Sequence, residues 1–124
     1  MVLVDSSVWV SHFRQKSPKL EQCLERELVL MHPLVIGELA CGNLHHRSEV
    51  LARLGLLPQA TAVSDTEALS FIESHRLMGT GIGYHDIHLL ASARPSAASL
   101  WTLDTALGRT ARRLDLHFHS EKRS

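Results

Sequence analysis

The sequence has few aromatic residues and few cysteines. Only 5% of its 124 residues are Phe, Trp or Tyr, which argues against a nucleic-acid-binding surface built from many stacked rings. The two cysteines, Cys23 and Cys41, form neither a disulfide framework nor a metal-binding spacing. Unpaired cysteines are typical of a reducing compartment, so we expect a cytoplasmic protein.

The chain also lacks an excess of either charge and a long apolar run. Its formal net charge is zero, so any role with nucleic acid must come from a local site and not from an overall basic field. No apolar stretch approaches the roughly 20 residues of a membrane helix, and the start MVLVDSS lacks the basic region of a signal peptide. We therefore expect one domain, residues 1–124, with a frayed charged tail at 120–124.

What the sequence does contain is an alternation of short apolar runs and helical patterns. This alternation predicts a three-layer α/β/α fold with a mainly parallel central sheet of about five strands. The predicted strands are residues 1–5, 28–31, 61–63, 98–102 and 116–119. The predicted helices are residues 6–13, 17–27, 33–44, 47–55, 64–78, 84–93 and 103–115.

Two aspartates directly follow predicted strands. Asp5 follows VLV and Asp104 follows LWTL. In parallel sheets, ligands bind outside the carboxyl ends of the strands. Each aspartate also precedes a predicted helix, so the alternative is a helix N-cap. The two roles are compatible, since Asp5 can cap a helix with one oxygen and bind a metal with the other.

Two further acids lie among apolar or small residues on predicted helices. Asp86 has Ile82, Leu89 and Leu90 at helical spacing, and a charge in such surroundings is costly unless it is paired or metal-bound. The alternative is a first-turn aspartate favoured by the helix dipole. Glu38 lies within PLVIGELACGNL, and its alternative is one solvated glutamate on a buried helix.

Together these four acids predict a metal site. Four carboxylates that converge at one sheet edge repel one another unless divalent cations neutralise them. Oxygen-only ligands suit Mg²⁺, with Mn²⁺ as a substitute. Such a site can activate water and stabilise the leaving oxygen of a phosphodiester.

Four segments, in this order, resemble the PIN-domain ribonucleases, specifically the VapC-type toxins of toxin–antitoxin pairs. They are VLVDSSVWV, PLVIGELACG, GIGYHDIHLLASA and LWTLD. The resemblance runs nearly end to end and implies a single PIN domain. It also implies that Asp5, Glu38, Asp86 and Asp104 form the catalytic acidic quartet.

The resemblance implies a role for each member of this quartet. Asp5 and Asp86 would contact Mg²⁺ directly, with Asp104 as a further metal ligand. Glu38 and Asp104 would complete the shell or position the water.

The same resemblance extends to residues around the quartet. Ser6 and Thr102 match hydroxyl residues that accompany the first and last aspartates and orient ligands or waters. Many relatives carry another acid shortly after the last aspartate. The stretch Thr105–Leu107 supplies none here, which leaves one versus two metal ions open.

The implied activity is cleavage of single-stranded regions of RNA by a metal-activated water, in line with the leaving 3′ oxygen. The implied partners are a cognate VapB-type antitoxin that covers the acidic site, a second toxin subunit in a homodimer, and a toxin–antitoxin hetero-oligomer. Arg109, Arg112 and Arg113 follow Asp104 on one predicted helix and are candidate RNA-binding residues, although a solvated helix face explains them too. The sequence does not identify the RNA.

Two other functions fit parts of the pattern. A PIN-like module that binds RNA or protein without catalysis would share the fold. An aspartate-based phosphatase also opens with a strand ending in Asp, but it needs a second Asp at the position that Ser7 occupies. The nine histidines lack zinc-site spacing, and the roles of His85 and His88, beside Asp86, remain open.

Overall fold

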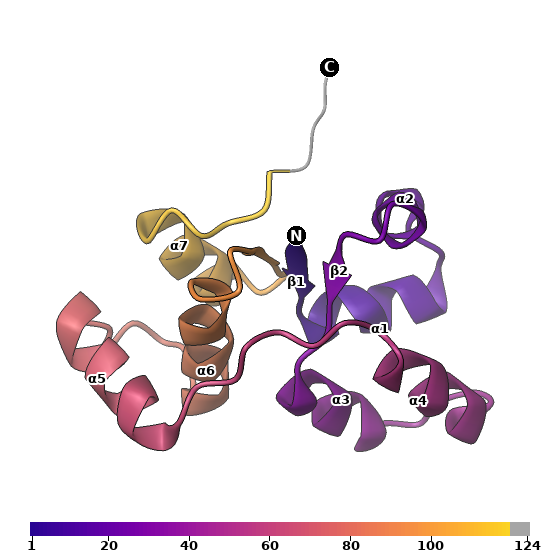
Figure 1. Ribbon diagram of the computed structural model, residues 1–124, viewed down its shortest axis with the longest axis horizontal. Coiled ribbons are helices and arrows are strands. Elements are labelled where there is room, and N and C mark those ends of the chain that lie inside the picture. The colour runs from indigo at the N-terminus through magenta and orange to yellow at the C-terminus, as the bar shows by residue number, and fades with distance from the viewer. Residues whose placement is uncertain (120–124) are drawn as a thin grey trace.

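The computed structural model describes residues 1–119, so the tail predicted for residues 120–124 lies outside the described residues. Within residues 1–119 the chain forms three strands and seven helices (Figure 1). The strands are β1 (Val2–Val4), β2 (Val29–Leu30) and β3 (Ser99–Trp101). The helices are α1 (Ser6–Arg14), α2 (Pro18–Glu25), α3 (Pro33–Ala40), α4 (Arg47–Gly55), α5 (Asp65–His75), α6 (Tyr84–Ala93) and α7 (Thr105–Arg113).

The three strands form a parallel sheet in the order β2-β1-β3. Val2 pairs with Val29 on one side and with Ser99 on the other. Helices flank the sheet on both sides, with α5, α6 and α7 to the left in Figure 1 and α1 to α4 to the right. Because β1 is central, its side chains are buried on both faces, which explains why VLV has no polar position.

The prediction of about five strands is wrong, because the sheet in residues 1–119 has three. The segment predicted as a strand at 61–63 lies outside the sheet, and the chain instead makes one parallel bridge between Gln59 and Met31. The Ala60 N–H donates to the Met31 carbonyl at 2.7 Å, whereas the Thr61 N–H faces away from β2 and donates to the Ser96 hydroxyl at 2.8 Å. The ladder ends here because the chain after Met31 enters α3 at Pro33 and offers no further strand partner.

The predicted last strand, 116–119, is likewise reduced to one parallel bridge, between His117 and Leu100. The Leu116 N–H donates to the Ala111 carbonyl at 2.8 Å and so still belongs to the end of α7. Only the Leu116 carbonyl and the Phe118 N–H reach Leu100, at 2.6 and 3.0 Å. Because the end of α7 uses the Leu116 N–H, one residue of this segment pairs with β3 instead of the predicted four.

The helices follow the predicted pattern with shorter ends. Ser64 and Glu67 form the predicted capping box at the start of α5, with bonds of 3.1 and 2.8 Å. This helix ends at His75 because Arg76 adopts a left-handed conformation with φ of 53°. The third helix ends at Ala40, earlier than the predicted residue 44.

One hydrophobic cluster joins the sheet to helices on both sides. Leu3 of β1, Leu100 of β3 and Leu89 of α6 are almost completely buried within it. Most of α6 after its first turn is buried, whereas its first turn lies beside the carboxyl edge of the sheet. Among the described residues, no helix is both long enough and apolar enough to cross a membrane.

Candidate active site

The carboxyl ends of β1 and β3 lie at one edge of the sheet because the two strands are parallel neighbours. Asp5 directly follows β1, and its N–H donates to the Trp101 carbonyl at 2.9 Å. Strand pairing therefore continues to Asp5 itself. It brings Asp5 into contact with Thr102, 97 residues later in the chain.

Asp5 is almost fully buried, with 5% of its surface exposed. Its Oδ2 accepts hydrogen bonds from the Ser7 hydroxyl at 2.7 Å and the Thr102 hydroxyl at 2.8 Å. The Ser7 N–H adds a longer bond of 3.4 Å to the same oxygen, which makes Asp5 the N-cap of α1. In the described part of the chain, every hydrogen bond to this carboxylate ends on Oδ2. Asp5 therefore caps with one oxygen, as predicted, and Oδ1 is left to other partners.

Thr102 links the two strand-end aspartates. Its Oγ1 donates to Asp5 and accepts the Asp104 N–H at 3.0 Å. Asp104 in turn caps α7, because its Oδ1 accepts the Leu107 N–H at 2.8 Å. Asp104 is exposed, and among the described residues no donor is assigned to its second oxygen.

Glu38 reaches the same region from α3, whose start is fixed by a buried histidine. His32 caps α3 by accepting the Leu34 N–H on Nδ1 at 3.0 Å, while its Nε2 lies 3.2 Å from the Ser92 hydroxyl of α6. Burial lowers the pKa of His32 to about 4, so the imidazole is neutral and carries its proton on Nε2. This arrangement ties the start of α3 to α6.

The Glu38 carboxylate contacts groups from two other helices. Its Oε1 accepts a hydrogen bond from the Ser6 hydroxyl at 2.5 Å and lies 3.3 Å from His85 Nε2. Ser6 belongs to α1 and His85 to α6. Glu38 is therefore held between the start of α1 and the start of α6.

Asp86 completes the acidic group from the first turn of α6. Its Oδ1 lies 3.4 Å from His85 Nδ1, and its Oδ2 accepts the Gly83 N–H at 3.4 Å. Burial raises the pKa of the Asp86 carboxyl above its ordinary value, and the negative charge of Asp5 adds to the increase. The contacts from His85 and Gly83 act in the opposite direction. His85 thus lies between the two carboxylates of the helices.

This donor set fits a divalent cation of the Mg²⁺ type. The ligands are carboxylate oxygens, and Asp5 and Glu38 each direct their described hydrogen bonds to a single oxygen. Burial, with a smaller effect from the charge of Asp5, raises the pKa of Asp86, and a cation would stabilise the ionised carboxylate there. Within residues 1–119, no three acidic, histidine or cysteine side chains are clustered closely enough to enclose an ion together. Mg²⁺ tolerates this because it is commonly held by one or two carboxylates and retains several waters.

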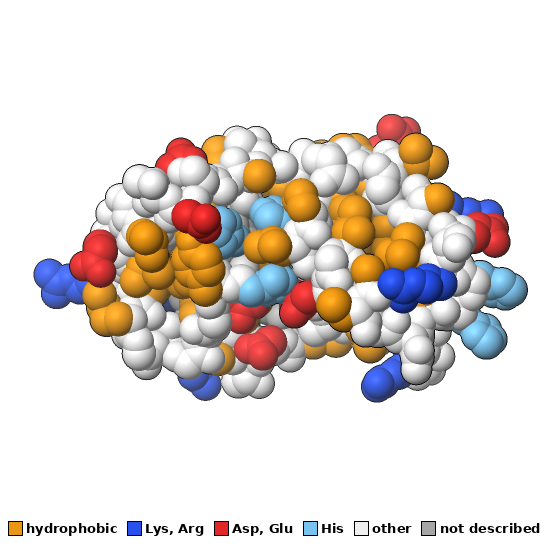
Figure 2. Space-filling view, turned by 90° about the horizontal axis from the view of Figure 1, so that it is seen from below, with side chains coloured by type: hydrophobic (Ala, Val, Ile, Leu, Met, Phe, Trp, Pro, Cys, Tyr) orange, Lys and Arg blue, Asp and Glu red, His pale blue; other side chains and the backbone are white. Residues whose placement is uncertain are grey.

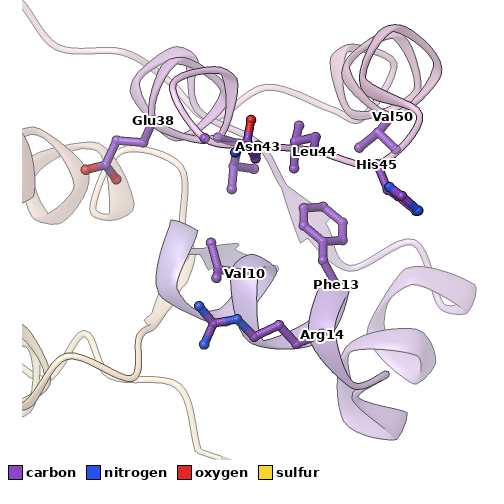
Figure 3. Close-up of a pocket in the computed structure, with 10 residues that line it drawn as sticks. Val10, Phe13, Arg14, Glu38, Asn43, Leu44, His45 and Val50 are labelled. Carbon is purple, nitrogen blue, oxygen red and sulfur yellow. The ribbon is translucent and has the colours of Figure 1, made fainter.

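Acidic and histidine side chains gather in the middle of the face seen from below the sheet, with hydrophobic side chains on either side (Figure 2). A groove of about 590 Å³ runs from Glu38 along α1, α3 and the start of α4. Figure 3 shows Val10 and Phe13 of α1 facing Leu44 and Val50 across this groove, with Glu38 at one end. Arg14 lies on the α1 side.

The structure brings together most of the residues predicted for the site. Ser6 contacts Glu38 and Thr102 contacts Asp5, as expected for hydroxyl groups that orient the acids. Sequence reasoning missed Ser7, although a hydroxyl two residues after a capping aspartate was the available signal. It left the role of His85 open, and only the fold places this ring between two acids.

The three candidate arginines on α7 differ in their surroundings. Arg113 donates to the carbonyls of His75 and Arg76 at the end of α5. Arg109 and Arg112 are exposed. Their contact with RNA stays a prediction.

Comparisons with known proteins agree with this geometry. The family model described as PIN domain matches residues 2–113. Ribonuclease VapC32 of Mycobacterium tuberculosis is 42% identical over 108 residues, which cover 86% of this chain and 87% of that protein.

Two solved structures share the fold at low identity. PAE2754 from Pyrobaculum aerophilum has a TM-score of 0.61 and 16% identity, covering 92% of this chain and 94% of that one. FitAcB from Neisseria gonorrhoeae has a TM-score of 0.59 and 17% identity, covering 90% and 94%. The chain therefore belongs to the PIN-domain family and, within it, to the VapC group.

Proposed function

We propose that this protein is a metal-dependent endoribonuclease that cleaves single-stranded regions of RNA. The observation that supports the proposal is a set of contacts that links the four acids in pairs. Thr102 joins Asp5 to Asp104, and His85 joins Glu38 to Asp86. The charge of Asp5 also acts on Asp86. The 42% identity to a protein named as a ribonuclease supports the choice of substrate.

Asp5, Asp86 and Asp104 are the residues that would hold Mg²⁺ or Mn²⁺. When bound, the ion supplies activation of water and stabilisation of charge on the phosphodiester oxygens. Ser7 and Thr102 hold the Asp5 carboxylate in one orientation by donating to its Oδ2. Ser6 does the same for Glu38 by donating to its Oε1, and the second oxygen of Glu38 would accept a hydrogen bond from the attacking water.

His85 has a separate function in this proposal. Its ring lies 3.3 Å from Glu38 and 3.4 Å from Asp86, so one side chain contacts both carboxylates. His85 therefore keeps the two acids oriented before a cation is bound.

We also propose a VapB-type antitoxin as the protein partner. The groove beside Glu38 is lined by exposed apolar side chains, including Val10 at 39% and Phe13 at 40% exposure. An apolar segment of the antitoxin would occupy this groove, with a cationic side chain directed at Glu38 and its acidic neighbours. Toxin subunits would pair as a homodimer within the hetero-oligomer.

The direct test is cleavage of RNA by the purified chain. Cleavage is expected with Mg²⁺ or Mn²⁺, to stop when a chelator is added, and to return when the metal is restored. Asp5→Ala and Asp86→Ala are expected to remove cleavage while the protein stays folded. Asp115→Asn is the matched control, because Asp115 is exposed and its φ of 59° is one that asparagine also adopts. Undiminished cleavage in either active-site variant would contradict the proposal.

Mapping the 5′ ends of RNA after induced expression would identify the substrate. We expect discrete ends that disappear in Asp5→Ala cells and when the antitoxin is co-expressed. Ends that are scattered without a preferred site would contradict a specific toxin.

A further inference from the structure

A second hollow, of about 400 Å³, adjoins the acidic centre. It lies between the start of α3, the segment before α5 and the first turn of α6. Leu34 and Val63 contribute apolar side chains, and Asp65, Tyr84 and His88 contribute polar groups. Its volume falls within the range of about 300–1,000 Å³ of small-molecule sites.

Tyr84 is the only tyrosine of the chain, and it is held in place at this hollow. Its hydroxyl donates to Asp65 Oδ1 at 2.5 Å, and its ring lies at 85° to the His88 ring with 4.8 Å between centroids. The residue is nevertheless 44% exposed. An aromatic ring that is oriented but accessible is suited to stacking against another flat ring.

Asp65 is not needed to start α5. Ser64 and Glu67 already form the capping box of that helix. The Asp65 side chain is 81% exposed, and its described contacts, from Tyr84 and from His88 Nε2 at 3.1 Å, both end on Oδ1. Among residues 1–119 no donor is assigned to Oδ2, which therefore provides an acceptor at the hollow.

His85 connects the hollow to the acidic centre. Its ring lines the hollow and also contacts Glu38 and Asp86. A nucleotide whose phosphate lies at the acids would thus have its base, or the base of its neighbour, within reach of Tyr84.

We infer that this hollow binds one nucleobase of the RNA next to the cleaved bond. The inference rests on the proposed function. The base stacks on Tyr84 against the apolar side chains of Leu34 and Val63, and its amino group donates to Asp65. Single-stranded RNA is recognised through stacked bases and their Watson–Crick edges. This pocket selects adenine, cytosine or guanine, whose exocyclic amino group donates to a carboxylate, over uracil, whose only donor on that edge lies between two carbonyl oxygens that repel a carboxylate.

The first test measures base binding without catalysis. As the sole tyrosine, Tyr84 has ring resonances that are assigned by comparison with Tyr84→Phe. The wild-type chain, without added metal, is titrated with adenosine, cytidine, guanosine, uridine and base-free ribose 5-phosphate. We expect the NMR chemical shifts of the Tyr84 ring to change when the nucleosides are added, least with uridine, and not to change with ribose 5-phosphate. Shifts with arginine methyl ester but with no nucleoside would overturn the inference and assign the hollow to a protein side chain.

The second test uses cleavage of a short RNA. Tyr84→Ala is expected to raise KM by about 5- to 150-fold, the usual effect of losing one stacked base, with little change in kcat. Tyr84→Phe keeps the ring and should retain most of the affinity. Asp65→Asn should abolish the discrimination against uracil at one position beside the cleavage site.

The outcomes separate the two proposals. If wild type does not cleave RNA, the proposed function fails, whereas the nucleoside titration still tests the hollow. If wild type cleaves and Asp5→Ala does not, but Tyr84→Ala keeps the same KM and cleavage sites, the base-binding inference is wrong and the nuclease stands.

Discussion

Asp5 and Asp86 belong to the same acidic centre but are held in different ways. On the strand side, Asp5 is buried and receives two short hydroxyl bonds of 2.7 and 2.8 Å. On the helix side, Asp86 is partly buried and its contacts, from His85 and Gly83, are both 3.4 Å. The strand side therefore fixes the orientation of the Asp5 carboxylate. On the helix side, the charge of the Asp86 carboxylate is only weakly compensated by its long contacts.

This difference has a physical cause. Adjacent parallel strands place Ser7, Thr102 and Asp5 in one continuous network that follows from sheet pairing. The helix side depends on how α3 and α6 pack together and on one imidazole between them. Poor compensation is common where a group is kept for function at a cost in stability.

The largest effect on RNA cleavage is expected for Asp5→Asn and Asp86→Asn, one variant for each side of the acidic centre. Both should lower RNA cleavage by at least about 100-fold, since even outer partners of metal ligands cost about 10- to 100-fold. Their effects on stability should differ in sign.

The pKa of Asp86 is raised in the folded state, so its ionisation costs stability as pH rises through that pKa. Asp86→Asn should therefore raise the melting temperature at neutral pH, whereas Asp5→Asn should lower it by weakening the bonds from Ser7 and Thr102. Thermal melts of the two variants beside Asp115→Asn measure this. Equal destabilisation by both variants would contradict the comparison.

The next effect tests the strand-side network. Thr102→Val keeps the shape of the side chain but removes the bond to Asp5 and the acceptor of the Asp104 N–H. We expect cleavage to fall by about 10- to 100-fold. We also expect the free energy of unfolding to fall by about 1–3 kcal/mol, because the partners are left unsatisfied. Thr102→Ser retains the hydroxyl and should recover most of both quantities in cleavage and denaturation assays.

A smaller effect is expected on the helix side. His85→Phe removes the contacts to Glu38 and Asp86, which are longer than 3.2 Å, and should lower cleavage by about tenfold, the low end for such partners. His85→Gln keeps one donor, so its cleavage activity should lie between those of His85→Phe and wild type. A loss in His85→Phe as large as that in Thr102→Val would mean that the two sides are equally important for orientation.

The smallest effect on activity, but a measurable one on stability, concerns His32. Its folded pKa of about 4 lies below the ordinary value of 6.5, so between these pH values only the unfolded chain binds the proton. Stability should fall as pH drops from 6.5 to 4, by as much as about 3 kcal/mol from this residue. His32→Asn keeps a good N-cap for α3 and should show a shallower fall in denaturation experiments at pH 7, 5.5 and 4.5. Identical slopes would contradict this role of His32.

Local sequence patterns were enough to predict the α/β class, the positions of all seven described helices to within a few residues, and the four candidate acids. These features are local: apolar runs, capping residues such as Ser64, and acids in apolar surroundings can be recognised without knowing the fold. The capping role of Asp5 and Asp104 is local as well, since the accepting carboxylate and the helix N–H groups are two or three residues apart.

Features that depend on partners far apart in the sequence appear only in the folded structure. The segments at 61–63 and 116–119 had strand-like patterns. The first loses its partner because the chain after Met31 enters α3, and the second loses the Leu116 N–H to the end of α7. In the same way, no spacing in the sequence places Thr102 on Asp5 or His85 between Glu38 and Asp86. Each of these contacts joins residues on different elements, and parallel strand pairing and helix packing bring them together.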